Sequence, residues 1–204
     1  LWITLKSTND ISHGHEDNGS IVVLNKGRPI IIDLGLADYS DNKECKFQVS
    51  QEGHNLPIIN DRLFDKPKSS ILKSNKHNSL CIVEKIKNNY IQTRLSSFDA
   101  LTCVKREILI NEESISIKDT IDKSPYKLNY YSCNWFTPEH SNSHKYVTAK
   151  IIKHKSDNRR EGVNNNIAKA YRSTKYGELS MANCHRVSAE VYIGESIVTN
   201  IALL

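Results

Sequence analysis

The chain has 204 residues, of which 38% are hydrophobic, enough for one large domain with its own core. Its 28 lysines and arginines only slightly exceed its 23 aspartates and glutamates, so the formal net charge is +5. The basic residues are dispersed, with few aromatic residues among them, which argues against a nucleic-acid-binding protein. No apolar run approaches the length of a membrane span.

The N-terminal third of the sequence predicts a strand followed by a hairpin. Alternation of apolar and polar residues predicts a strand over residues 2–8. Residues 21–24 and 30–33 form a second and third strand, separated by a turn in which Gly27 supplies the positive φ. Pro29 stands at the start of the third strand, where its missing N–H is tolerated. The hairpin therefore delivers Asp33 at its far end.

The rest of the chain is expected to be built from short strands. Residues 34–53 are rich in Gly, Asp, Asn and Ser and predict a long surface loop, and residues 157–166 form a second polar excursion. No stretch has helical periodicity with helix caps. Strands are predicted at 56–59, 79–86, 90–95, 101–111, 114–122, 127–136, 145–154, 187–193 and 197–204. The fold class is therefore all-β, an antiparallel β-sandwich of roughly a dozen strands, and residues 1–204 form a single domain.

The cysteines are five in number, widely spaced and without a Cys-x-x-Cys pair. This pattern predicts buried free thiols and argues against a disulfide framework or a thiolate zinc site, although the spacing is also compatible with a single bridge. The five residues are Cys45, Cys81, Cys103, Cys133 and Cys184.

A candidate chemical site lies between the first strand and the hairpin. His13, His15 and Asp17 alternate with other residues, so in an extended segment all three point to one face. Two imidazoles beside a carboxylate suit metal binding or proton transfer. The alternative is an ordinary histidine-rich loop, because a His-x-His pair is also common where no site exists.

Two later residues extend this cluster. Pairing of the hairpin strands returns Asp33 to the neighbourhood of His15, and His54 can reach the same place through the loop between them. Two neutral imidazoles and a carboxylate form a good zinc set with a fourth position left over. The alternative is that Asp33 caps the loop and His54 is a turn histidine.

The ordered motifs of this chain resemble the C-terminal β-sandwich domain of the heparinase II/III-like family. The resemblance is carried by the HxHxDxGS run at residues 13–20, Asp33-Leu-Gly35, Tyr39, and His54-Asn55. Residues 105–109, with Arg106, and residues 117–119, with Asp119, also look like the arginine strand and the paired aspartate strand of that domain.

The resemblance implies a polysaccharide lyase that cleaves uronic-acid-containing chains by β-elimination. It implies that His15, Asp33 and His54 hold a structural Zn²⁺ and that His13 faces the substrate as acid/base or carboxylate partner. One imidazole nitrogen cannot both ligate zinc and transfer a proton, which agrees with this division. Asp17 is then expected either to orient a ligand or to hydrogen-bond the turn at Gly19.

The family's tyrosine base, and an asparagine or histidine beside it, come from an N-terminal helical domain. We therefore expect this chain to be a C-terminal fragment lacking an N-terminal α/α toroid, and to be inactive alone. Its expected partners are an acidic polysaccharide and that helical domain. The family suggests a periplasmic or secreted protein, whereas the odd set of free cysteines is also compatible with the cytoplasm.

Two other functions are compatible with the same residues. The chain could be a non-catalytic carbohydrate-binding or scaffold β-sandwich domain of a glycan-assembly protein, with zinc kept for folding alone. A zinc hydrolase would need an open coordination position and a nearby general base. Glu16 points away from the cluster in an extended segment, which disfavours the hydrolase.

Overall fold

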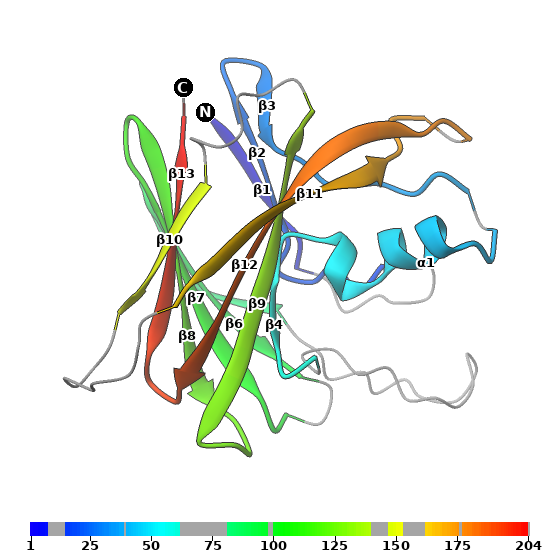
Figure 1. The fold of residues 1–204 in the computed structure, drawn as a ribbon. Coiled ribbons are helices and arrows are strands. Elements are labelled where there is room, and N and C mark those ends of the chain that lie inside the picture. Colours follow the sequence, from blue (N-terminus) through cyan, green and yellow to red (C-terminus); the bar gives the residue numbers. More distant parts are fainter. Residues whose placement is uncertain are drawn as a thin grey trace.

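The computed structural model describes residues 1–7, 15–38, 40–61, 81–97, 100–139, 147–152, 162–175 and 177–203. Within these ranges, thirteen strands form three sheets in which every pairing is antiparallel, and there is one α-helix (Figure 1). The expected all-β antiparallel sandwich is confirmed.

The three sheets differ in size. The small sheet has the order β1-β2-β3, the largest has the order β10-β13-β8-β7-β6-β5, and the third has the order β11-β12-β9-β4. The strands are β1 (Trp2–Leu5), β2 (Ile21–Asn25), β3 (Arg28–Ile31), β4 (Pro57–Ile59), β5 (Cys81–Lys87), β6 (Tyr90–Ser96), β7 (Cys103–Ile110), β8 (Ser114–Lys123), β9 (Leu128–Pro138), β10 (Val147–Ile152), β11 (Asn164–Arg172), β12 (Ser180–Tyr192) and β13 (Ser196–Ala202).

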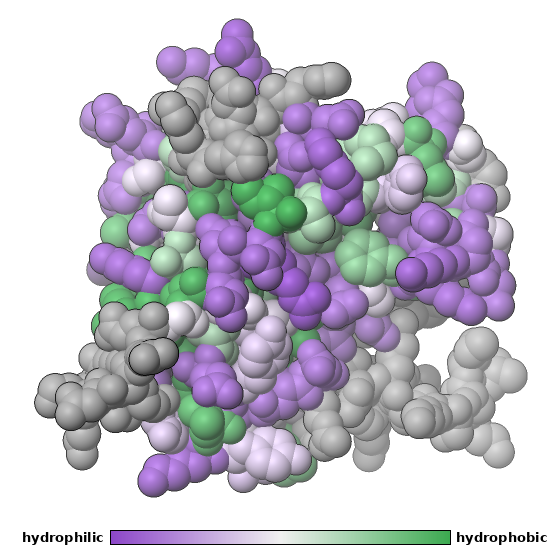
Figure 2. All heavy atoms as spheres, in the orientation of Figure 1, coloured by the Kyte–Doolittle hydropathy of each residue, from purple (hydrophilic) through white to green (hydrophobic). Residues whose placement is uncertain are grey.

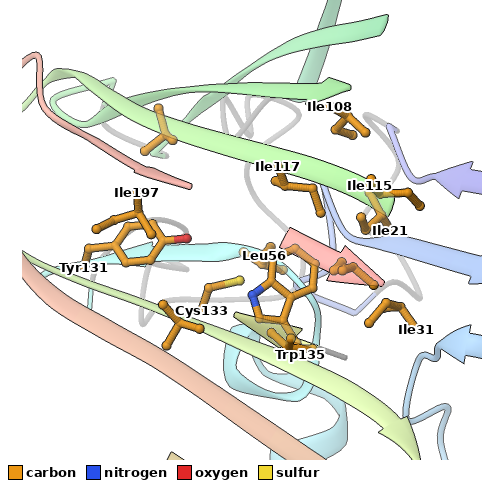
Figure 3. Close-up of a cluster of buried hydrophobic side chains, with 14 of the residues drawn as sticks. Ile21, Ile31, Leu56, Ile108, Ile115, Ile117, Tyr131, Cys133, Trp135 and Ile197 are labelled. Carbon is orange, nitrogen blue, oxygen red and sulfur yellow. The ribbon is translucent and has the colours of Figure 1, made fainter. Parts of the chain in front are cut away.

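The main core contains apolar side chains from all three sheets. Tyr131, Cys133 and Trp135 are alternate residues of β9 that share one face of the strand and are fully buried in this core. Figure 3 shows them facing isoleucines of the largest sheet. Phe136, on the other face, is buried in a second, smaller cluster. Burying each large apolar side chain contributes about 1.5–3 kcal/mol. The core isoleucines of β7 and β8 are Ile108, Ile115, Ile117 and Ile121.

The predicted hairpin is confirmed and places Asp33 next to the sandwich. Strands β2 and β3 pair across a turn in which Lys26 and Gly27 have φ values of +49° and +77°, the two positive angles that a tight hairpin turn needs. Just after β3, the N–H of Ile32 donates to the carbonyl of Phe136 on β9 at 2.9 Å. The chain beyond the hairpin is therefore fixed to the third sheet.

The prediction that residues 34–53 are entirely loop is wrong. The structure has a helix α1 (Lys43–Val49) there, followed by the 3-10 turn η1 (Gln51–Gly53). Asn42 caps α1 by accepting a hydrogen bond from the N–H of Cys45 at 2.7 Å. Phe47 packs edge-on against Phe136 with the ring centroids 6.4 Å apart. A seven-residue helix is too short to show the apolar repeat by which helices are recognised.

Of the polar stretch predicted at residues 157–166, residues 157–161 lie outside the described residues, and Asn164–Asn166 are exposed but begin the strand β11 and are not loop. This strand pairs only with β12, at the edge of its sheet, and most of its side chains are exposed. An edge strand that buries little has no need of an apolar sequence pattern. The strand can therefore be recognised from its pairing with β12 but not from its own sequence.

The cysteine prediction is confirmed, since all five are free and buried. On the surface, Figure 2 shows a face on which polar side chains predominate and apolar ones form only small groups. Among the described residues, no helix is long and apolar enough to cross a membrane.

Candidate metal centre

The segment from His15 to Ser20 is held against the end of β1 by its backbone. The N–H of Gly19 donates to the carbonyl of Lys6 at 2.8 Å, and the N–H of Ser20 donates to the carbonyl of Asp17 at 2.9 Å. Gly19 has a φ of +92°, and a Cβ atom there would collide with the side chain of Leu95. Glycine is required here for both reasons.

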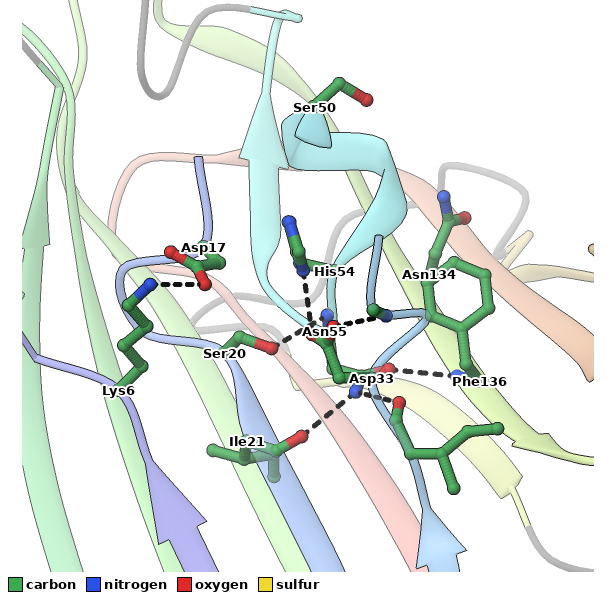
Figure 4. Close-up of polar contacts among 12 residues, drawn as sticks. Lys6, Asp17, Ser20, Ile21, Asp33, Ser50, His54, Asn55, Asn134 and Phe136 are labelled. Atoms are coloured by element: carbon green, nitrogen blue, oxygen red, sulfur yellow. Dashed lines mark hydrogen bonds and ion pairs between the residues drawn. The ribbon is translucent and has the colours of Figure 1, made fainter. Parts of the chain in front are cut away.

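Asp33 and His54 form the second part of the site. Nδ1 of the His54 ring lies 2.8 Å from Oδ2 of Asp33, and the other oxygen of Asp33 accepts the N–H of Gly35 at 2.8 Å (Figure 4). Burial acts to raise the pKa of Asp33, but the contacts with His54 and Gly35 outweigh it and hold the pKa below its ordinary value. Asp33 is thus kept ionised against a fully buried imidazole.

His15 and Asp17 approach the same imidazole. The rings of His15 and His54 are 5.3 Å apart between centroids and tilted by 37°. One ligand atom of each of His15, Asp17 and His54 lies within 4.8 Å of the others. Asp17 also forms an ion pair with Lys6, with Oδ2 and Nζ 2.6 Å apart.

Two buried atoms of this cluster have no hydrogen-bond partner among the described residues. They are Nε2 of His54 and Oδ1 of Asp17. Leaving a buried polar atom unpaired costs about 1–3 kcal/mol. Five other buried side-chain atoms among the described residues also lack a hydrogen-bond partner, so these two are distinguished by lying together among metal-ligating residues. Two unpaired atoms in one cluster of metal-ligating residues favour a bound cation.

The charge state of the cluster suits the same ligand. Desolvation by burial, reinforced by the neighbouring His54, lowers the pKa of His15 below its ordinary value. A neutral imidazole and an ionised carboxylate are the forms that bind zinc. The residues present therefore fit a zinc ion by residue type, protonation and unpaired atoms.

The sequence-predicted site residues have separate outcomes. His15 and Asp33 both lie next to His54, at the contacts given above. His13, the predicted substrate-facing residue, lies outside the described residues, and so does Tyr39 of the resemblance. Whether His15, Asp33 and His54 hold a metal stays a prediction.

Asp17 was expected to orient a ligand or to hydrogen-bond the turn at Gly19, but the structure places it among the possible metal ligands. Its side chain pairs with Lys6 and not with the turn at Gly19, which is closed by backbone hydrogen bonds. It is also nearly fully buried and contributes to the cluster of possible ligands. Lys6 itself was missed, because nothing in the sequence pairs a lysine at the end of a strand with an aspartate eleven residues later.

The expected arginine and aspartate strands are confirmed as a buried ion pair beneath the site. Arg106 on β7 lies opposite Asp119 on β8 and donates to both of its carboxylate oxygens, at 2.7 and 2.8 Å. Tyr131 donates its hydroxyl to Asp119 at 2.7 Å. Asp119 raises the pKa of Arg106, although desolvation opposes this, so the pair stays charged inside the core.

A small hollow of about 190 Å³ lies next to the segment of His15 and Asp17, since Glu16 between them is part of its lining. It is lined by three carboxylate side chains, those of Glu16, Glu52 and Asp61, together with Ser50, Gln51 and Ile58. Three carboxylates in one hollow give it a negative electrostatic potential.

Comparison with known proteins gives the relationship of the chain. Residues 5–149 match the family model described as heparinase II/III-like, C-terminal. No curated protein sequence matches significantly.

Solved structures agree in fold. The chain is similar to a heparinase III structure, with a TM-score of 0.70 and 14% identity over 98% of this chain and 32% of that one. It is also similar to the heparan sulfate lyase HepC from Pedobacter heparinus, with a TM-score of 0.64 and 15% identity over 93% of this chain and 31% of that one. The chain thus spans about a third of the length of these structures. By its sequence match, it belongs to the heparinase II/III-like family, through the C-terminal domain of that family.

Proposed function

We propose that this chain is the C-terminal domain of a polysaccharide lyase that cleaves uronic-acid-containing acidic glycans by β-elimination. The observation that carries the proposal is the family match, supported by His54, which contacts Asp33 and lies beside the ring of His15. Two structures of similar fold, a heparinase III and a heparan sulfate lyase, support the same substrate class.

The chemistry sets what the site must supply. In β-elimination, a base removes the proton at C5 of the uronate, and the glycosidic oxygen at C4 leaves with the electrons of its bond. The proton at C5 is only weakly acidic, so negative charge that builds on the adjacent carboxylate must be neutralised or hydrogen-bonded. We assign His13 to this surface, as acid/base or as partner of the substrate carboxylate.

We propose that Zn²⁺ is held by His15, Asp33 and His54 and is chiefly structural. Bound there, the ion would supply a positive charge that ties the hairpin to the turn after α1. Asp17, the second carboxylate of the cluster, is placed to neutralise or complete this centre. His13, to which we assign the substrate-facing role, stands two residues before His15 in the sequence.

The proposed partners are an acidic polysaccharide and an N-terminal helical domain that contributes the catalytic base. This division agrees with the coverage of about a third of the related structures. By the same resemblance, we propose a periplasmic or secreted location. The 204-residue chain alone is then expected to be inactive.

The test is an eliminase assay on the full-length gene product. Heparan sulfate, alginate and bacterial capsular uronates are supplied in parallel, and ultraviolet absorbance of the unsaturated uronate is followed. We expect activity on at least one glycan, a loss of about 100-fold or more in His13→Ala, as for removal of an acid/base group, and little change in Glu16→Gln. No product from any of the glycans, or strong activity from the isolated chain, would contradict the proposal.

A further inference from the structure

Asn55 directly follows His54 and is fully buried, with its side-chain amide completely used. Its Nδ2 atom donates to the carbonyl oxygens of Ile21 and Ile32 at 2.9 and 2.7 Å. Its Oδ1 atom accepts the N–H of Phe136 at 2.9 Å. Figure 4 shows these bonds radiating from Asn55 to separate segments of the chain.

The bonding partners of Asn55 are the neighbours of the proposed metal ligands. Ile32 immediately precedes Asp33, so the amide fixes the backbone from which that carboxylate extends. Ser20 and Ile21 end the segment that begins at His15, and the N–H of Asn55 donates to Oγ of Ser20 at 3.2 Å. A single residue thus connects the segments of all three ligands.

Arg106 holds Asn55 from the other side. Its Nη1 atom donates to the carbonyl oxygens of Asn55 at 2.9 Å and of Gly19 at 3.1 Å. The remaining donors go to Asp119 and to Sγ of Cys133. All five N–H groups of this fully buried guanidinium are therefore directed at protein acceptors. The carbonyl of Gly19, in the segment of His15, and the carbonyl of Asn55, next to His54, thus bind the same rigid guanidinium group.

We infer that Asn55, held by Arg106, is a positioning residue that sets the separation of His15, Asp33 and His54 for metal binding. The inference rests on the proposed zinc site and goes beyond it by naming residues outside the ligand set. The primary amide offers two donors and an acceptor on one short plane, as the three backbone partners require. Serine is shorter and has a single O–H donor, so it cannot reproduce this pattern.

If Asn55 only stabilised the fold, replacing another buried asparagine should affect zinc affinity to the same extent. A second buried asparagine, Asn129, allows this comparison. Asn129 is also nearly fully buried, on β9. Its Nδ2 atom donates to the carbonyl of Tyr126 at 3.0 Å, and its Oδ1 atom accepts from Nδ2 of Asn60 at 2.8 Å and from the hydroxyl of Ser124. None of these partners adjoins a proposed ligand. Asn129→Ser is therefore the matched control.

The experiment measures zinc affinity by competition with a chromogenic chelator, at a temperature where circular dichroism shows every variant folded. We expect Asn55→Ser to weaken binding about 10–100-fold, as when residues that orient metal ligands are removed, and Asn129→Ser to leave it unchanged. Arg106→Lys keeps the charge but not the paired donors, and it should lower affinity in the same direction, which preserves the test if Asn55→Ser does not fold. Unchanged affinity in Asn55→Ser and Arg106→Lys, or equal losses in Asn129→Ser, would overturn the inference.

A metal-free measurement separates this inference from the zinc proposal. If the wild-type protein takes up no zinc, the proposed metal function fails, but the imidazole NMR signals of His15 and His54 still report their placement. We expect the hydrogen-bonded Nδ1 signal of His54 to be lost or strongly shifted in Asn55→Ser and kept in Asn129→Ser. The same imidazole spectrum in wild type and Asn55→Ser would refute the positioning role.

Discussion

Nδ1 of His54 lies 2.8 Å from Oδ2 of Asp33, although the two residues are twenty-one positions apart in the sequence. The contact joins the turn after α1 to the end of the hairpin. Nε2 of the same ring is buried and has no partner within the described part of the chain. Asp33 thus holds one nitrogen of the imidazole, while Nε2 remains available for a bound ligand.

The two carboxylates of the cluster can be told apart by substitution. We expect Asp33→Asn to abolish measurable zinc binding, because it removes both a proposed ligand and the partner of His54. Asp17→Asn should weaken binding only about 10–100-fold, as for a residue that acts on the ligands. Competition with a chelator measures both. A larger loss in Asp17→Asn than in Asp33→Asn would exchange the roles of the two residues.

The stability of the metal-free protein should fall in mild acid because of His15. Its pKa is lower in the folded protein than in the unfolded chain, mainly through desolvation. The unfolded state therefore binds more protons, and the contribution of His15, present above the unfolded pKa of about 6.5, is lost as the pH falls through the folded pKa. Urea unfolding between pH 8 and pH 5 in the presence of chelator measures it. His15→Gln should flatten this part of the curve, and an equally steep curve in that variant would exclude His15 as the cause.

Breaking the buried ion pair of Arg106 and Asp119 should strongly destabilise the domain. Arg106→Met leaves Asp119 charged and unpaired in the core, which typically costs about 3–5 kcal/mol in free energy of unfolding. Urea denaturation gives the value. The exposed pair of Arg94 and Glu84, 2.5 Å apart on the outer face of the same sheet, provides the control. Arg94→Gln should cost about 1 kcal/mol or less, and equal losses in both variants would show that burial does not set the value of the Arg106 pair.

All five cysteines should be free thiols even without a reductant, and they should react slowly in the folded protein. Burial raises the pKa of Cys133 and of Cys184 to about 12, so little thiolate forms at neutral pH. A thiol titration without reductant should therefore count five thiols after denaturation and few before it. A count of three after denaturation would reveal a disulfide.

Sequence patterns predicted the elements whose own residues show apolar and polar alternation or a turn glycine. The β2–β3 hairpin was predictable because alternation and Gly27 specify both strands and turn. Helix α1 was missed because seven residues carry too little pattern, and β11 because its asparagine-rich sequence is stabilised by pairing with β12. Strand order and the separation of the three sheets depend on long-range pairing and could not be derived this way.

The residue types of the candidate site were predictable from the sequence, but the contacts that hold these residues in place were not. His15, Asp33 and His54 were recognisable from their order and from the family resemblance. The contacts that place them are different in kind: Arg106 reaches the carbonyl of Asn55 across fifty-one positions of the sequence. Such a contact leaves no local pattern, because it depends on how β7 packs against the turn after α1.

The metal content of the purified protein tests the central claim most directly. Protein prepared without chelator should contain one equivalent of zinc per chain by elemental analysis. His15→Ala should lose it and melt at a lower temperature, because binding a structural metal contributes to folding, while His13→Ala should keep both metal and melting temperature. A well-folded wild-type protein that contains no zinc and takes up none would contradict the account.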